Sequence, residues 1–267
     1  MSSKIRLLLS DVDGTLVPHD KVLTDRSLHA VRHLHDAGIT FAITSSRPPR
    51  GLAMYLGPLH LSTPIAAFNG GMIIDPDQRI LVERDLDDEI VPTIIGVLEE
   101  HAIPAWVYRG PEWYVRDATS PHVRHEAAVC QFEPLEVANF DSLSDGVAKI
   151  VGASDDADAL ARARTALSAS VGERVSATNS QAYYLDITNP QANKGVVVEY
   201  LSSMFNVPTD AIATIGDAHN DVAMFGRSGL SIAMGNAEAD VKASATEVTA
   251  SNEDEGFARA VEEFILS

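Results

Sequence analysis

Short apolar runs alternate with helical spacing in the first part of the chain. Three runs have the length and composition of buried strands: residues 5–10, 39–44 and 64–68. Apolar residues at helical spacing separate the first two runs, between a plausible cap at Thr24 and a stop signal at Gly38. Pro48 suits the first turn of a second helix. This order of strands and helices predicts a parallel sheet with crossover helices.

The middle of the chain has a different rhythm. Residues 73–75 and 80–82 flank a turn and predict a hairpin. Further short strands are predicted around 106–109, 113–116, 148–151 and 183–187, and two helices at 87–100 and 155–167. Short strands mixed with two helices indicate a separate α+β unit over residues 83–189.

The alternating rhythm then resumes. The predicted elements are a helix at 193–205, strands at 211–215 and 230–233, a helix at 221–226 and a final helix capped by Asn252. We found no internal repeat and no glycine-rich nucleotide-binding pattern. The predicted fold class is α/β: a doubly wound parallel sheet made by residues 1–82 and 190–267, interrupted by the α+β insert 83–189.

Composition and charge exclude several functions. The 267 residues include 38 acidic and 20 basic side chains, a formal net charge of −18 that disfavours general nucleic-acid binding. An anionic substrate would therefore need a local cation. Cys130 is the only cysteine, so neither an intrachain disulfide nor a four-thiolate zinc site can form. The apolar run at residues 5–9 is too short for a signal peptide and no window resembles a membrane span, so we expect a cytoplasmic protein.

Two carboxylates follow the first predicted strand, in the segment Asp11-Val12-Asp13-Gly14-Thr15. In open α/β sheets, ligands bind beyond the carboxyl ends of the strands. If the backbone stays extended, Asp11 and Asp13 share one face, where two carboxylates repel unless a cation or proton separates them. A solvated turn explains the same pair about as well.

A second acidic cluster follows the strand predicted at 211–215. Asp217 and Asp221 are four residues apart, and Asn220 adds a neutral oxygen. Hard oxygen ligands suit Mg²⁺. An N-capped helix would explain one of these acids but not the whole group.

Positively charged and hydroxyl groups also occur at predicted element ends. Lys194 opens a predicted helix, where the helix dipole disfavours a cation. A phosphate bound at that helix end would explain this position. Ser45-Ser46-Arg47 follows the second strand and could offer a hydroxyl and backbone N–H groups to the same anion. Taken singly, a capping serine or a solvated lysine is the simpler explanation.

Together these segments resemble the haloacid dehalogenase superfamily, in its Cof-type (class IIB) branch of sugar-phosphate phosphatases. Residues 11–16 (DVDGTL) look like the first motif, Ser45 stands at the hydroxyl of the second, Lys194 matches the third, and residues 216–221 (GDAHND) match the fourth. Asn69 also lies where this branch has it. One departure is that the branch usually reads Thr-Gly-Arg where this chain has serines at positions 45 and 46.

The resemblance implies an Mg²⁺-dependent phosphatase acting on a small phosphorylated metabolite. Asp11 would be the nucleophile and Asp13 the general acid and base. The implied metal site comprises Asp11, Asp13 through its backbone carbonyl, Asp217 and Asp221, with Asp221 and Asn220 orienting waters or the lysine. The implied phosphate-binding set is Ser45, Ser46, Arg47, Asn69, Lys194 and Asn220.

The insert at 83–189 matches the large cap of this branch, which closes over the site and selects substrates. Trp106 and Tyr108 share a strand face, and with Trp113 they could stack on a sugar or form the cap core. His122 and His125 could bind a metal, but a partly exposed helix face is the simpler reading. Cys130 is expected to be a small buried residue, and His219 is assigned no role.

Two alternatives to a phosphatase remain at this point. Relatives with similar caps are phosphohexomutases, which keep their phospho-enzyme from water and usually need a bisphosphate activator. A receiver-type phosphoacceptor module would have an aspartate at the end of the third strand, where this chain has Asn69, and would leave the insert without a purpose. The identity of the substrate and the oligomeric state are not predicted.

Overall fold

One sheet of eight strands is the centre of the larger part of the molecule. The computed structural model describes residues 4–267; residues 1–3, at the start of the segment considered as a signal peptide, lie outside it. The strand order is β14-β13-β12-β1-β2-β3-β4-β5. The bounds are β1 (Leu7–Asp11), β2 (Thr40–Thr44), β3 (Ile65–Ala67), β4 (Met72–Ile74), β5 (Ile80–Glu83), β12 (Ile212–Gly216), β13 (Leu230–Ala233) and β14 (Glu247–Val248). Strands from β14 to β3 are parallel and β4–β5 is an antiparallel hairpin, as the sequence predicts.

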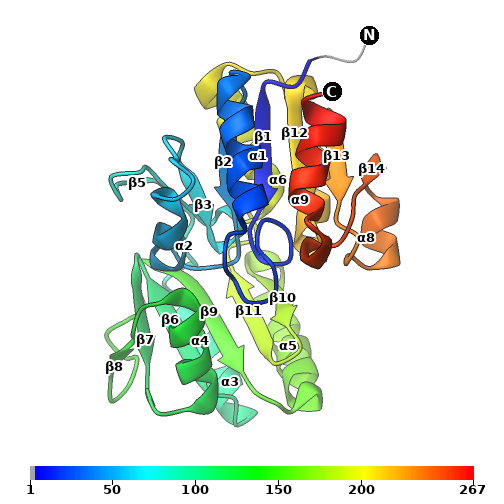
Figure 1. Ribbon diagram of the computed structural model, residues 1–267. Coiled ribbons are helices and arrows are strands. Elements are labelled where there is room, and N and C mark those ends of the chain that lie inside the picture. The colour runs from blue at the N-terminus through cyan, green and yellow to red at the C-terminus, as the bar shows by residue number, and fades with distance from the viewer. Residues whose placement is uncertain (1–3) are drawn as a thin grey trace.

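Helices cover both faces of this sheet (Figure 1). They are α1 (Asp25–Asp36), α2 (Pro49–Leu56), α6 (Lys194–Phe205), α7 (Val222–Phe225), α8 (Ala239–Ala243) and α9 (Gly256–Ala260). Side chains alternate along β1: Leu8 packs with residues of α1 and α9, whereas Leu7 and Leu9 pack with residues of α6. The central strands are therefore buried on both sides, whereas the edge strands β5 and β14 are largely exposed, and the predicted doubly wound α/β class is confirmed.

A second sheet lies between residues 105 and 188, within the segment predicted as the insert. Its order is β10-β11-β9-β6-β7-β8. The strands are β6 (Ala105–Arg109), β7 (Glu112–Val115), β8 (Leu135–Glu136), β9 (Val147–Ala153), β10 (Ser176–Gln181) and β11 (Tyr184–Thr188), and the helices are α3 (Val91–Glu100), α4 (Pro121–Cys130) and α5 (Ala157–Val171). The helices α3 and α5 pack with one face of this sheet in a separate apolar cluster. From the other face, the ring of Tyr108 lies 5.3 Å from that of Phe68, which follows β3.

Three predictions about local structure differ from the observed elements. Helix α4 was not assigned as an element from the sequence, although the helix face considered for His122 and His125 lies in it; three of its ten residues are buried, Val123, Ala127 and Cys130. Strand β10 was missed because its polar sequence, SATNSQ, lacks apolar alternation and it is an edge strand. Asn252 does not cap the last helix: it begins a short 3₁₀ turn, and its Nδ2 donates to the carbonyl of Val17 at 3.3 Å.

The carboxyl ends of the parallel strands face the insert. In Figure 1 the dark-blue loop that follows β1 lies between the two sheets. The residues singled out from the sequence therefore cluster where the two parts of the chain meet. Within residues 4–267, no helix combines the length and apolar character needed to cross a bilayer.

Candidate active site

A buried lysine joins two carboxylates at the end of β1. Asp11 is the last residue of β1, and Lys194 is the first residue of α6, whose N-cap is Asn193. The Nζ of Lys194 lies 2.6 Å from Oδ1 of Asp11 and 2.6 Å from Oδ1 of Asp221. Lys194 is only 1% exposed. The two carboxylates compensate both the burial of this ammonium and its unfavourable place at a helix N-terminus.

Burial and neighbouring charges together determine how Asp11 and Lys194 ionise. Desolvation raises the pKa of Asp11 well above its usual value; Lys194 opposes this, and the neighbouring charges of Asp221 and Asp217 add to it. Burial lowers the pKa of Lys194, but the two carboxylates outweigh it and raise that pKa. The lysine thus stays charged, while the carboxylates repel one another.

Asp221 positions the lysine and also closes the loop after β12. Its Oδ2 accepts hydrogen bonds from the backbone N–H groups of Asp217 and Ala218, both at 2.9 Å. The carboxyl group folds back against Gly216, where an added Cβ would lie 2.3 Å from the Cγ of Asp221. Both Asp221 oxygens are therefore engaged within the protein.

Asp217 is held by groups from two other strand ends. The hydroxyl of Thr15 donates to its Oδ1 at 3.1 Å, and the amide of Asn236, which follows β13, donates to its Oδ2 at 3.1 Å. The same amide contacts the carbonyl of Gly14 at 2.9 Å. Gly14 has φ +80°, and an added Cβ would lie 2.3 Å from Oδ2 of Asp217, so only glycine fits. Burial, followed by the charge of Asp221, raises the pKa of Asp217 to about 6.

This cluster has the chemistry of a site for a hard divalent cation. Asp11, Asp217 and Asp221 each offer a carboxylate oxygen within 4.8 Å of the others. A divalent cation would relieve the repulsion that raises the pKa values of Asp11 and Asp217. The side-chain carboxylate of Asp13 is not part of this cluster. Asp13 was predicted in the metal set through its backbone carbonyl.

Asp13 instead makes a bidentate ion pair with Arg47. The Nε and Nη2 atoms of Arg47 lie 2.7 Å from its Oδ2 and Oδ1, and the Nζ of Lys21 lies 2.8 Å from Oδ1. Burial raises the pKa of Asp13, but the hydrogen bonds and charges of Arg47 and Lys21 outweigh it and lower the pKa to about 2. Arg47 also donates to the carbonyl of Val129 in α4, at 3.2 Å, and so connects Asp13 to the insert.

The predicted phosphate-binding residues lie on adjacent loops. Asp11 pairs with Thr44 in the sheet register, so Ser45 directly follows the strand next to Asp11. The hydroxyl of Ser45 accepts from the backbone N–H of Arg47 at 3.1 Å. Asn69, at φ 57°, accepts at Oδ1 from the side-chain amide of Asn220 at 3.0 Å. Among the described residues, the buried Oδ1 of Asn220 has no hydrogen-bond partner.

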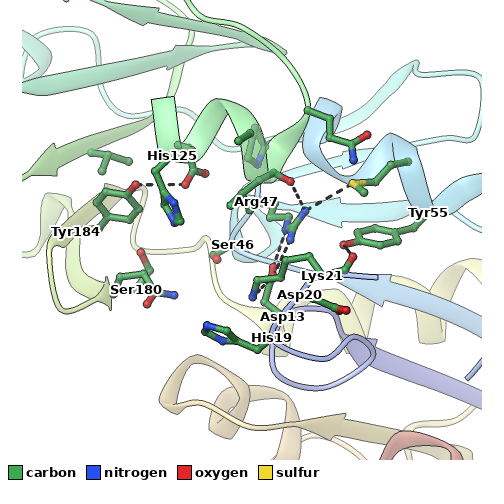
Figure 2. A pocket seen from close by; sticks show the side chains of 18 of the residues that line it. Asp13, His19, Asp20, Lys21, Ser46, Arg47, Tyr55, His125, Ser180 and Tyr184 are labelled. Atoms are coloured by element: carbon green, nitrogen blue, oxygen red, sulfur yellow. Dashed lines mark hydrogen bonds and ion pairs between the residues drawn. The ribbon is translucent and has the colours of Figure 1, made fainter. Parts of the chain in front are cut away.

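A cavity of about 820 Å³ opens beside Asp13 and Arg47. Figure 2 shows Lys21, Ser46 and Arg47 on one side of it and Tyr184, His125 and Ser180 on the other. The walls therefore come from both the eight-stranded sheet part and the insert.

The side chains of Trp106, Tyr108 and Trp113 are buried, with at most 2% exposed. Trp106 packs against Trp113 at 5.3 Å between ring centroids, and Tyr108 stacks on Trp113 at 5.8 Å. Trp106 and Tyr108 also line the cavity, whereas Trp113 is not among the lining residues. These rings therefore pack together on the face of the insert sheet opposite α3 and α5, in the apolar cluster that continues into the eight-stranded sheet part, and two of them line the cavity.

Comparison with known proteins agrees with this geometry. A family model for haloacid dehalogenase-like hydrolases matches residues 8–261. The chain belongs to this family. The resemblance expected from the motifs is confirmed.

Similar proteins extend the match over nearly the whole length of this hydrolase. The 5-amino-6-(5-phospho-D-ribitylamino)uracil phosphatase YitU of Bacillus subtilis is 28% identical over 274 residues, covering 99% of both chains. The HMP-PP phosphatase of an Enterobacter species is 28% identical over 233 residues, covering 87% of this chain and 85% of its own. The crystal structure of a haloacid dehalogenase-like hydrolase from Bacteroides thetaiotaomicron has a TM-score of 0.89 at 26% identity and covers 97% of this chain and 99% of its own. The protein is therefore an enzyme, a phosphatase of this family.

Four residues at this site of the hydrolase were not found from the sequence. Lys21 and Asn236 contact Asp13 and Asp217, and Lys149 and Asp186 line the cavity from the insert. Asn236 could have been found from the sequence, because it follows the predicted strand at 230–233 and ligands in open α/β sheets bind beyond the carboxyl ends of the strands. No signal in the sequence points to the other three.

The remaining candidates fall outside the site. Cys130 is buried, burial raises the pKa of its thiol, and it is therefore a poor nucleophile. In the described part of the chain, neither His122 nor His125 belongs to a group of three metal-binding side chains. His219 is largely exposed and pairs with Asp240 at 2.8 Å, away from the carboxylate cluster around Asp11.

Proposed function

We propose that this hydrolase removes phosphate from monoesters of small metabolites, in particular sugar phosphates, with Mg²⁺ as cofactor and an aspartyl-phosphate intermediate. The observation that carries the proposal is the convergence of Asp11, Lys194, Asp217 and Asp221 at a strand edge, beside a cavity lined by Asp13. The relatives named above support it, because their names denote phosphatases of small phosphorylated metabolites, one carrying its phosphate on a ribityl chain.

In the first step, a carboxylate oxygen of Asp11 attacks phosphorus, the bond from phosphorus to the ester oxygen breaks, and Asp13 gives its proton to the leaving oxygen. Lys194 holds Oδ1 of Asp11, so Oδ2 is the oxygen left for attack. The fixed charge of Lys194 stabilises the negative charge that builds up around phosphorus, and the burial of this group strengthens the effect.

In the second step, a water attacks the phosphoryl group, the bond from phosphorus to Asp11 breaks, and Asp13 takes the proton of that water. This releases inorganic phosphate and restores both carboxyl groups to their starting protonation. The same residue thus serves as acid and then as base, as microscopic reversibility of the two half-reactions suggests.

Asp13 must be protonated for the first step, although Arg47 and Lys21 hold its pKa at about 2. An incoming phosphate would compete with Asp13 for these two cations and would place negative charge beside it. Both effects raise the pKa of a carboxyl group. Substrate binding itself would therefore prepare Asp13 to donate a proton.

Mg²⁺ would be held by Asp11, Asp217 and the backbone carbonyl of Asp13, with Asp221 positioning Lys194 and the loop rather than adding a free oxygen. The bound ion would neutralise charge between the carboxylates and the phosphate. Ser45, Ser46, Arg47, Asn69 and Asn220 would complete the phosphate site, and residues 83–189 would act as a cap on the core formed by 1–82 and 190–267.

The two aspartates can be separated with p-nitrophenyl phosphate, whose leaving group departs almost without a proton. Asp13→Asn should give a burst of at most one nitrophenolate per active site followed by very slow turnover, with the phosphoryl group on the peptide that contains Asp11. Asp11→Asn should give neither burst nor phospho-enzyme. Asp240→Asn, at an exposed position, is the matched control. A phosphoryl group on any other peptide contradicts the mechanism.

Phosphate release from a panel of metabolites distinguishes a phosphatase from a mutase. We expect continuous release with Mg²⁺ and without a bisphosphate activator. Conversion of a hexose phosphate into its isomer, dependent on a bisphosphate, would show instead that the protein is a mutase.

A further inference from the structure

A second buried lysine, Lys149 of the insert, lines the cavity. Lys149 on β9 and Asp186 on β11 both line it, and their Nζ and Oδ2 atoms are 2.6 Å apart. Lys149 is 6% exposed and Asp186 is 3% exposed. These strands are neighbours in the centre of the insert sheet, so their backbone holds the ion pair in place.

The pair has unused hydrogen-bonding capacity. An ammonium has three N–H donors. Among the described residues Lys149 donates one to the carbonyl of Ser46, 3.3 Å away, and its contact with Oδ2 of Asp186 is an ion pair without hydrogen-bond geometry. Neither of the two buried carboxylate oxygens of Asp186 has a hydrogen-bond partner in the described part of the chain. A buried carboxylate oxygen without a donor is costly, and a ligand in the cavity could satisfy it.

The charges around the cavity indicate what kind of ligand fits. The lysine and arginine residues among its described lining residues are Lys21, Arg47 and Lys149, and each is already paired with Asp13 or Asp186. Asp20 and Glu126 add further negative charge to the wall. A second phosphate on the substrate would meet no unpaired lysine or arginine there. A neutral group that both accepts and donates a hydrogen bond would fit.

We propose that Lys149 and Asp186 are specificity-determining residues that bind hydroxyl groups of the leaving alcohol, so that the substrate is the phosphate of a polyol or sugar with one phosphate only. Lys149 donates to a hydroxyl oxygen, and Oδ1 of Asp186 accepts from the same or a neighbouring hydroxyl. Trp106 and Tyr108, which line the cavity nearby in β6, offer flat walls to the C–H faces of such a chain. This inference rests on the proposed function and names the residues that recognise its substrate.

The competing explanation is structural. Through the carbonyl of Ser46, Lys149 also ties the insert to the predicted phosphate-binding loop. If that were its only role, removing it would slow every substrate alike. A readout that compares substrates with and without hydroxyl groups distinguishes the two explanations.

The experiment uses two matched pairs of primary phosphate monoesters: glucitol 6-phosphate with n-hexyl phosphate, and ribitol 5-phosphate with n-pentyl phosphate. Within each pair the carbon chain is the same and only the hydroxyls differ. For the unmodified enzyme with Mg²⁺, we expect kcat/KM to favour a polyol phosphate over its alkyl partner by about 10- to 100-fold, the value of a hydrogen bond to a charged group. An enzyme that hydrolyses p-nitrophenyl and alkyl phosphates without this preference overturns the inference.

Substitutions at Lys149 and Asp186 test whether this pair causes the preference for polyol phosphates. Lys149→Met and Asp186→Asn should each remove most of the preference, mainly by raising KM for the polyol phosphate. The double variant Lys149→Met/Asp186→Asn leaves no unpaired buried charge and keeps the test possible if a single variant does not fold. A folded variant that keeps the preference, or that slows all four esters equally, contradicts the proposal. Failure of the unmodified enzyme on every ester, p-nitrophenyl phosphate included, would overturn the proposed function itself.

Discussion

Lys194 and Lys149 are both buried lysines, yet their surroundings differ. Lys194 has two carboxylates at 2.6 Å and is the first residue of a helix in the core. Lys149 has one carboxylate at 2.6 Å and a backbone carbonyl at 3.3 Å, and it lies on a strand of the insert. Lys194 donates to both of its carboxylates, whereas Lys149 donates to a backbone carbonyl, and among the described residues its counter-ion Asp186 has no hydrogen-bond partner on either oxygen. We infer that the core uses its lysine to hold reacting groups in place and the insert uses its lysine to recognise a ligand.

The largest expected difference is in turnover. Lys194→Met removes a preorganised charge next to Asp11, the proposed nucleophile, so we expect kcat to fall roughly 100-fold or more for every phosphate ester. Lys149→Met should change kcat for p-nitrophenyl phosphate by less than about threefold, because that ester has no hydroxyl chain to recognise. Steady-state kinetics of both folded variants measures this. Comparable losses of kcat on p-nitrophenyl phosphate would contradict the different roles inferred for the two lysines.

Metal removal should affect the carboxylate cluster around Lys194 and leave the Lys149–Asp186 pair unchanged. With excess chelator we expect turnover to be abolished and the Tm to fall, because a ligand that binds only the folded state stabilises it by mass action. Mg²⁺ should restore both, whereas Ca²⁺ should restore no turnover, since it favours looser coordination. Lys149→Met should respond to metal like the unmodified enzyme. Full activity in chelator would exclude the metal-dependent mechanism.

The stability of the metal-free protein should depend on pH through Asp217. Its pKa is about 6 when folded and its ordinary value is 3.8. Between these values the folded state binds more protons than the unfolded state, so the contribution of Asp217 to stability is largest near pH 4 and is lost as pH rises through 6. Asp217→Asn should therefore gain stability over the unmodified protein as pH rises from 4 to 7. Thermal unfolding with chelator present measures the difference, and parallel curves for the two proteins would contradict the prediction.

The last expected effect is on the stability of the insert rather than on turnover. Lys149→Met leaves Asp186 buried without its counter-ion, which costs about 3–5 kcal/mol in comparable buried pairs. Adding Asp186→Asn removes the unpaired charge and should recover most of that loss. Denaturant unfolding of the single and double variants gives the coupling between the two positions. No recovery in the double variant would show that Lys149 stabilises the insert by other contacts.

The core could be predicted from the sequence because its signals are local. Apolar runs and helical spacing lie within single segments, and they place Asp11, Ser45 and Asp217 at or just beyond strand ends. Parallel strands bring their carboxyl ends to one edge, so the convergence of these residues follows from the pattern without coordinates. Lys194 was found for a similar reason, because a cation at a helix start is unusual in itself.

The insert was less predictable. Helix α4 and strand β10 carry weak or polar patterns, and the tertiary packing around them decides their structure. Lys149 and Asp186 meet because residues 37 positions apart lie on paired strands whose register brings Thr188 opposite Lys149 and Asp186 opposite Val151. A register shift of one residue would turn one of them away from the cavity.

The sequence by itself therefore determined the α/β class of the core, most of its strands and helices, and which polar residues stand at the carboxyl edge of the sheet. The tertiary structure decided their partners: Arg47 and Lys21 on Asp13, Asn236 on Asp217, and Lys149 beside Asp186 and Ser46. The physical reason is the range of the forces involved. Periodicity and capping act within a few residues, whereas a buried charge finds its counter-ion only after distant segments have packed together.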